Sequence, residues 1–188
     1  MTILETNNLT LSLCTPADRA DFIDLERDPE VMHFLNRGAV DHENTDPDKV
    51  NFLMPRGTEP YVWTARRRET GEFVGWFCLY PETEKLAEIG YRLRRNAWGQ
   101  GLASEGAVTL VDWGFNHAGY ESVVACTMTV NYGSRRVMEK IGMRHTKTVS
   151  IDAGELQGGE HGEVWYEVTL REWADKQGRS NNGAENLM

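Results

Sequence analysis

The segment of residues 87–106, AEIGYRLRRNAWGQGLASEG, constrains the fold of this chain more than any other. An apolar strand pattern runs into a turn that contains Gly99 and Gly101, and a helical pattern follows at once. Glycine lets the backbone approach a ligand closely, and the first N–H groups of a helix point outward with the positive end of the helix dipole behind them. The segment therefore predicts a backbone site for an anion, although the same glycines would also suit a corner that only turns the chain.

A second motif, NYGSRRVMEKIGM, occupies residues 131–143 after a further strand pattern. Asn131 and Ser134 precede a short amphipathic helix there, and Gly142 follows it. Together the two blocks resemble the motifs of the GNAT superfamily, the acyl-CoA-dependent N-acyltransferases. The stretches LTLSLCTPADRADFIDLERDPEVMHFL and VWYEVTLREW resemble the two ends of the branch that acetylates ribosomal-protein N-termini. The resemblance thus covers residues 9–173 in unbroken order.

This resemblance implies the GNAT fold, a mixed α/β, α+β-like arrangement with a strongly twisted mixed sheet of about six to seven strands flanked by helices. Strand patterns at residues 61–67, 72–80 and 85–93 predict an antiparallel meander after a first strand at residues 9–13. Residues 122–130 form a strand parallel to residues 85–93 if the helix between them is a right-handed crossover. Residues 143–151 and 164–170 predict a closing hairpin. The two parallel central strands splay apart and create a cleft.

Helix signals fall between these strands. Thr15, Pro16 and Asp18 form an N-cap, a proline at the first helical position and an acid at N3. A second cap at Asp28 and Pro29 predicts a short helix through residues 31–34. The crossover helix begins near residue 103 and is closed by glycine 119. Residues 36–60 are polar, with a short helix at residues 46–54 as one interpretation.

Length and charge limit the classes of function. The chain has 188 residues, which predicts a single acyltransferase domain over residues 1–175 and a polar, mobile tail over residues 176–188. Its net charge of -9 argues against a nucleic-acid or membrane-surface binder, because either would need a cationic face. An acidic balance fits a cationic substrate.

Cysteine and histidine positions predict no metal site. Three cysteines lie far apart without a C-x-x-C pair, and five histidines are equally scattered. We expect free thiols, and with no signal peptide or transmembrane run in view, a cytoplasmic protein. The cysteines are Cys14, Cys78 and Cys126.

The family resemblance also implies where acetyl-CoA binds. It places the pyrophosphate on the amides of Gly99, Gln100, Gly101, Leu102, Ala103 and Ser104, and the pantetheine against the strand edge of Tyr91, Arg92 and Leu93. Many superfamily members have Gln or Arg where this chain has Trp98. That departure leaves the anchor to backbone amides and nearby cations.

The densest positive run near the turn is Arg92, Arg94 and Arg95. In an acidic chain these guanidinium groups would steer or bind phosphate, or they form a solvated strand end. Arg136 beside the second motif has the same two interpretations.

The reaction needs a base for the amine and a hydrogen-bond donor for the leaving thiolate. By resemblance Glu88 is the base; otherwise it is a surface carboxylate of the strand. Met138 stands where many superfamily members have a tyrosine acid. Ser134 matches the serine that the ribosomal-protein branch offers to the sulfur, and it would also suit a helix cap. Asn131 is expected to bond cofactor amides, or to stand at the strand corner.

These observations predict an enzyme that transfers acetyl from acetyl-CoA to a primary amine, of a protein N-terminus or a small molecule, without an acyl-enzyme. The alternative is a non-enzymatic acyl-CoA-binding regulatory module. A phosphate-loop hydrolase is set aside because the turn lacks the G-K-[ST] ending. Residues 36–60 and 152–163 are expected to choose the amine. Relatives in this branch are often dimers, so a homodimer is a further expectation.

Overall fold

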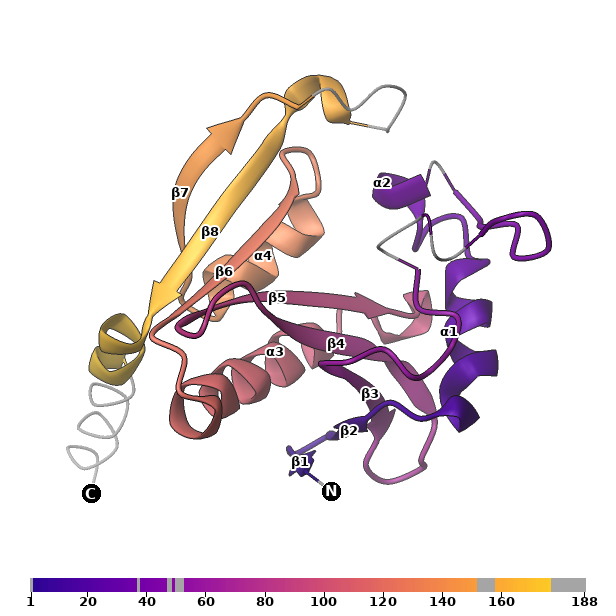
Figure 1. Ribbon diagram of the computed structural model, residues 1–188, viewed down its shortest axis with the longest axis horizontal. Coiled ribbons are helices and arrows are strands. Elements are labelled where there is room, and N and C mark those ends of the chain that lie inside the picture. The colour runs from indigo at the N-terminus through magenta and orange to yellow at the C-terminus, as the bar shows by residue number, and fades with distance from the viewer. Residues whose placement is uncertain (1, 37, 47–48, 50–52, 152–157, 177–188) are drawn as a thin grey trace.

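A computed structural model describes residues 2–36, 38–46, 49, 53–151 and 158–176, and it contains one eight-stranded sheet. The strand order is β1-β2-β3-β4-β5-β6-β8-β7 (Figure 1). Every neighbouring pair is antiparallel except β5 and β6, which are parallel as predicted. The strands are β1 (Ile3–Glu5), β2 (Leu9–Leu13), β3 (Val62–Arg67), β4 (Phe73–Pro81), β5 (Leu86–Leu93), β6 (Ser122–Met128), β7 (Arg144–Val149) and β8 (Glu163–Thr169).

The mixed sheet confirms the predicted fold class, with eight strands instead of six or seven. The added strand is β1, which pairs with β2 from Ile3 opposite Ser12 to Glu5 opposite Thr10. Three residues are too few for an alternating pattern to stand out in the sequence, and pairing with β2 is what makes them a strand.

The labelled α-helices are α1 (Arg19–Glu26), α2 (His33–Asn36), α3 (Leu102–Trp113) and α4 (Tyr132–Lys140), and the described residues 170–176 are helical as well. The crossover helix α3 continues as a π-helical turn over Gly114–Ala118, and Gly119 ends it with φ 80°, as predicted. The helix expected from Pro29 begins only at His33, because the Asp28 carboxylate accepts the N–H of Glu30 and holds a turn there. Most of residues 46–54, the segment of the expected short helix, and the tail beyond residue 176 lie outside the described residues.

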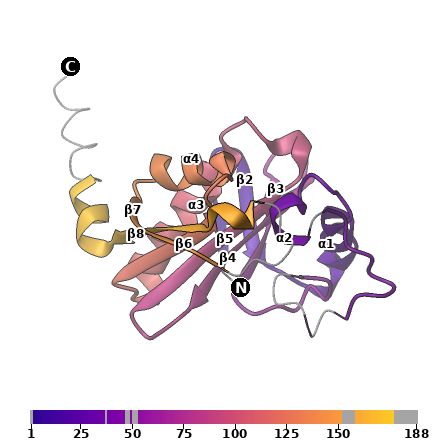
Figure 2. The ribbon, with the colours of Figure 1, turned by 90° about the horizontal axis from the view of Figure 1, so that it is seen from above.

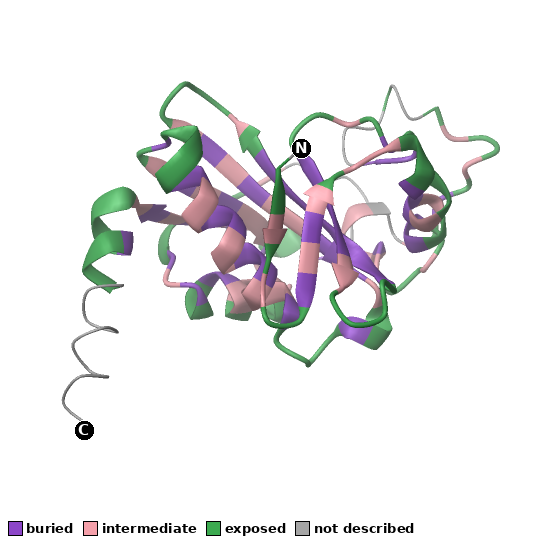
Figure 3. Cartoon of the chain, turned by 90° about the horizontal axis from the view of Figure 1, so that it is seen from below, coloured by how far each residue is buried: buried purple, intermediate pink, exposed green. Residues whose placement is uncertain are grey.

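Alternation along β4 divides its side chains between two cores. Phe77 and Leu79 enter the core with α3 and α4, whereas Trp76 and Cys78 enter the core with α1. The helices α1 and α3 therefore cover opposite faces of the sheet (Figures 1 and 2). Buried and half-buried residues alternate along the strands, whereas the helices carry exposed residues on their outer sides (Figure 3).

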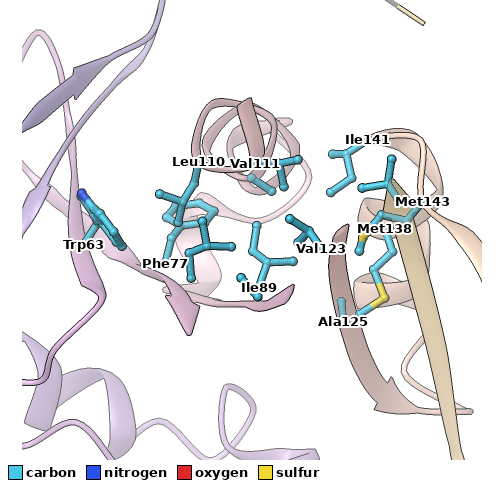
Figure 4. Packing of buried hydrophobic residues seen from close by; sticks show 14 of the residues in the cluster. Trp63, Phe77, Ile89, Leu110, Val111, Val123, Ala125, Met138, Ile141 and Met143 are labelled. Atoms are coloured by element: carbon cyan, nitrogen blue, oxygen red, sulfur yellow. The ribbon is translucent and has the colours of Figure 1, made fainter. Parts of the chain in front are cut away.

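The larger core fixes how α3 crosses the sheet. Leu110 and Val111 of α3 meet Phe77 and Ile89 of the strands, beside Met138 and Ile141 (Figure 4). At Gly106 an ideal Cβ would lie 2.3 Å from the Phe77 ring, so the backbone of α3 rests directly on β4. This contact sets the height of the helix N-terminus above the end of β5.

We expect Gly106→Ala to destabilise the protein by about 1–3 kcal/mol, because the added methyl group would occupy the position of the Phe77 ring. Gly133→Ala is the matched control. It also lies in a helix, but its nearest foreign atom is 3.7 Å from the ideal Cβ, so alanine should be neutral or stabilising there. Urea unfolding of both variants measures the difference. Equal stability of Gly106→Ala and the parent would contradict the close approach.

Candidate active site

The parallel strands β5 and β6 pair over three residues only. The partners are Leu86 with Ser122, Ala87 with Val123 and Glu88 with Val124. Beyond Glu88, β5 continues to Leu93 along β4, and β6 continues to Met128 along β8. The two strands diverge from that point (Figure 1). Within the described residues, the edge of β5 from Ile89 to Leu93 therefore faces no strand and can bond a ligand.

The glycine turn lies at the far end of this edge, and the space beside its two glycines is free of protein atoms. Gly99 and Gly101 have φ values of 72° and 81°, which favour glycine, yet no atom lies within 4 Å of the ideal Cβ of either. Backbone conformation, not packing, requires glycine here. The indole N–H of Trp98 donates to the Leu93 carbonyl at 2.8 Å and holds the turn against β5.

The helices α3 and α4, which follow β5 and β6, differ in how their N-termini are capped. Gly101 is the N-cap of the twelve-residue helix α3, and no side chain caps that end. The N–H groups of its first turn are thus available to an anion. At α4, in contrast, the Asn131 side-chain oxygen accepts the N–H of Ser134 at 3.2 Å. Its amide donates to Thr127 at 3.0 Å, so the structure places Asn131 as a helix cap.

The arginines next to the turn bind carboxylates of α1. Arg92 is buried beside Glu26, with 3.5 Å between guanidinium and carboxylate, and lies over the Trp76 ring. Arg94 pairs with Asp21 and Asp24 at 3.3 and 3.0 Å. This corrects the expectation that these two side chains are available to phosphate, because α1 already balances their charge.

Two other cations are candidates for a phosphate. Arg136 is exposed on α4, with no carboxylate partner among the described residues. Arg67 at the end of β3 donates to the Gln100 side chain at 2.6 Å and also contacts Glu72. Sequence analysis missed Arg67, because only the pairing of β2, β3 and β4 brings it to the turn.

Glu88 lies at the point where the strands part. It is half-buried, and its Oε1 is 3.4 Å from the Cys126 thiol of β6. Burial raises the pKa of the Glu88 carboxyl, the Cys126 hydrogen bond partly offsets that rise, and the charges of Glu82 and Glu163 add to it. A carboxylate with a raised pKa is a better proton acceptor than an exposed one. Cys126 was not expected as its neighbour, since the two residues are adjacent only through the β5–β6 pairing.

Ser134 lies across the divergence, where it meets Tyr91. The Tyr91 hydroxyl is 3.0 Å from the Ser134 carbonyl oxygen and 3.1 Å from its Oγ. Met138 is buried in the larger core, near Ile141 and Met143 (Figure 4). The structure therefore brings a tyrosine hydroxyl to Ser134 from β5 instead of from α4.

Glu88 and Tyr91 belong to opposite faces of the sheet. Residue 92 turns toward α1 and residue 91 toward α4, as their contacts with Glu26 and Ser134 show. Glu88 shares the face of Arg92 because alternate strand residues share a face. A group held between the diverging strands would meet a carboxylate on one side and two hydroxyls on the other.

No group of three or more His, Cys, Asp or Glu side chains is placed to hold a metal ion among the residues described. Nor does that part of the chain contain a helix long and apolar enough to span a membrane.

Comparison with known proteins identifies relatives of this arrangement. The family model described as "Acetyltransferase (GNAT) domain" matches residues 8–144. The FsC-acetyl coenzyme A-N(2)-transacetylase of Aspergillus fumigatus is 36% identical over 164 residues, which cover 81% of this chain and 70% of that protein. The uncharacterized protein YkkB of Bacillus subtilis is 34% identical, with coverage of 79% and 88%. A GNAT-family acetyltransferase of Bacillus anthracis shares the fold with a TM-score of 0.75 at 22% identity, covering 89% of this chain and 98% of its own.

The raised pKa of Glu88 predicts a pH-dependent cost to stability. Its folded pKa lies above the unfolded value of about 4.3, so the parent loses stability as pH rises from that value through the folded pKa. Glu88→Gln removes this loss. Its stability relative to the parent should therefore increase over that window and stay constant above it.

Glu105→Gln is a control of opposite sign. Burial opposes ionisation of Glu105, but hydrogen bonds from Thr6 and Asn8 outweigh it and lower the pKa. That carboxylate stabilises the fold above the unfolded pKa and loses its contribution as pH falls through the folded pKa. The Gln variant should be the less stable protein at neutral pH. Urea unfolding from pH 4 to 8 tests both, and parallel curves for Glu88→Gln and the parent would refute the raised pKa.

Proposed function

Because the chain belongs to the GNAT family and is an acetyl-CoA-dependent N-acetyltransferase, we propose that it acetylates a primary amine of a protein N-terminus or a small molecule. The observation that carries this proposal is the divergence of β5 and β6 at Glu88, with an open, uncapped glycine turn at the other end of the free edge. A relative named as an N(2)-transacetylase supports nitrogen as the acceptor atom.

The residues present fit acetyl-CoA. The amides of residues 99–104 would hold its pyrophosphate, because the turn is open in front and the α3 N-terminus has no side-chain cap. The edge of β5 at residues 91–93 would bond the pantetheine amides, and Arg136 and Arg67 are the candidate cations for its phosphates. When bound, acetyl-CoA supplies a thioester carbonyl and a thiol leaving group.

Glu88 would accept a proton from the amine, directly or through a water molecule. The amine type sets how hard this step is: an α-amine has a pKa near 7.8, whereas a lysine amine near 10.4 needs roughly 3.5 kcal/mol more to deprotonate. In the whole reaction the N–C bond forms and the C–S bond breaks. The ammonium loses two protons, one through Glu88 to water and one to the sulfur.

Ser134 would donate its hydroxyl hydrogen bond toward the sulfur from the other face of the sheet. Glu88 and Ser134 thus serve the attacking and leaving groups from opposite sides. This arrangement favours direct transfer, because the Cys126 thiol beside Glu88 is held in its protonated, weakly nucleophilic form: burial and the Glu88 charge raise its pKa.

The surroundings of Glu88 favour a cationic acceptor. Glu82 and Glu163 lie close enough for their charges to raise its pKa, and the chain as a whole has a net charge of -9. A protonated amine would be attracted to this face before it is deprotonated. The three free cysteines of this chain fit a reducing compartment such as the cytoplasm. A homodimer remains a prediction.

Gly101→Asp should weaken acetyl-CoA binding by at least about tenfold, because a carboxylate would then face the pyrophosphate. Arg94→Ala should have little effect, since Arg94 pairs with α1. Gly71→Asp is the matched control: its φ of 72° and open surroundings resemble those of Gly101, but it lies in the β3–β4 turn. Titration calorimetry measures all three. An unchanged dissociation constant for Gly101→Asp would remove the cofactor from this turn.

Glu88→Gln should lower kcat, and the deficit should shrink as pH approaches the pKa of the acceptor amine, because a neutral amine no longer needs a base. Glu82→Gln is its control. It removes a neighbouring charge, so the pH profile should shift to lower pH while its maximum stays the same. Free-thiol release from acetyl-CoA across a panel of amines measures both. A deficit of Glu88→Gln that does not change with pH would show that Glu88 is not the base.

A further inference from the structure

The Tyr91–Ser134 contact joins β5 to α4, the helix that follows β6. Tyr91 extends from β5 after its pairing with β6 has ended, and Ser134 lies in the first turn of α4, 43 residues later. The phenol ring packs against Phe77, with 6.1 Å between ring centroids, and against the larger core. The ring is therefore held in place, and its hydroxyl is presented to Ser134.

The phenol has one proton and two acceptors within reach. When it donates to the Ser134 carbonyl at 3.0 Å, the serine hydroxyl can donate back to the phenol oxygen at 3.1 Å. When the serine hydroxyl turns toward another acceptor, the phenol can donate to Oγ instead. In the second arrangement two hydroxyls form a chain, and each hydrogen bond strengthens the next.

We propose that Tyr91 is a positioning residue, which orients and polarises the Ser134 hydroxyl toward the leaving sulfur. This inference rests on the proposed function, because it requires Ser134 to face the sulfur. Met138, at the position of the usual tyrosine acid, is buried and has no hydroxyl to assist the leaving sulfur. The inference assigns that assistance to a tyrosine of β5.

Burial supports a donor role for the phenol. It raises the pKa of Tyr91 to about 12, so the hydroxyl keeps its proton at neutral pH. A phenol that keeps its proton can polarise the serine without transferring the proton. The competing explanation is a purely structural contact that ties α4 to β5.

The two explanations differ in what happens to the thiol of bound CoA. Thiolate absorbance, followed as a function of pH with CoA bound, gives the pKa of that thiol without any turnover. We would measure it for the parent, Tyr91→Phe, Ser134→Ala and the double variant. Tyr91→Phe keeps the ring and its packing against Phe77, and thermal melting confirms that each variant is folded.

Tyr166→Phe is the matched control. Tyr166 is also a strand tyrosine whose hydroxyl bonds α4: it accepts from Arg135 at 3.3 Å and donates to Glu139 at 2.7 Å, and neither bond involves Ser134. Its removal should weaken the attachment of α4 as much as Tyr91→Phe does, and it should leave the thiol unchanged.

We expect Ser134→Ala to raise the pKa of the bound thiol by about one unit, the effect of losing a hydrogen bond to a charged group. Tyr91→Phe should raise it by roughly half a unit, through loss of polarisation. The double variant should match Ser134→Ala, and kcat should fall in the same order. Affinity for acetyl-CoA should remain within about twofold of the parent in all variants.

Three outcomes would overturn the inference. If the pKa of the bound CoA thiol in Tyr91→Phe equals that in the parent, while Ser134→Ala raises it, the tyrosine contact is structural. Additive effects in the double variant would mean that Tyr91 acts without Ser134. If neither variant changes the thiol, or the parent does not bind CoA, the proposed role of Ser134 or the cofactor assignment fails first, and the inference fails with it.

Discussion

The divergence of two parallel strands after three residue pairs is the constraint on which the rest of this structure depends. Pairing with β4 on one side and β8 on the other holds β5 and β6, so each strand can leave its partner without leaving the sheet. Past Glu88 the backbone of β5 has hydrogen-bonding groups without a strand partner. Such groups are costly when buried away from water unless a ligand bonds them. The sheet is thus left open along the free edge of β5, because β5 and β6 pair over only three residues.

Packing of the crossover helix determines what the free edge of β5 can bind. The absence of a side chain at Gly106 allows α3 to rest on Phe77, which brings its uncapped N-terminus to the end of the free edge. Burial of Arg92 and pairing of Arg94 with α1 then leave the backbone as the main donor for an anion. The strand alternation separates Glu88 from Tyr91, which gives proton removal and leaving-group assistance different faces of the sheet.

Local sequence patterns were enough to predict most of the strands and the crossover helix. The meander, the parallel strand, the crossover helix and its end at Gly119 follow from periodicity and from glycine conformations, which depend on neighbours in sequence. The three-residue β1 and the late start of α2 were missed, because a strand partner and an Asp28 turn decided them. The neighbours of the site residues were missed for the same reason: Cys126, Arg67 and the carboxylates of α1 reach their partners only through the sheet.

The sequence by itself determined the glycine turn, the helix that follows it and the serine at the start of the next helix, because a positive φ, a helix start and a motif spacing are properties of consecutive residues. It also determined the family. Only the tertiary structure decided that two arginines bind α1 and that the tyrosine beside Ser134 comes from β5. Each of those contacts is set by the register of the strands and the height of the helices above them. Register and height result from the packing of the whole core, which no single segment contains.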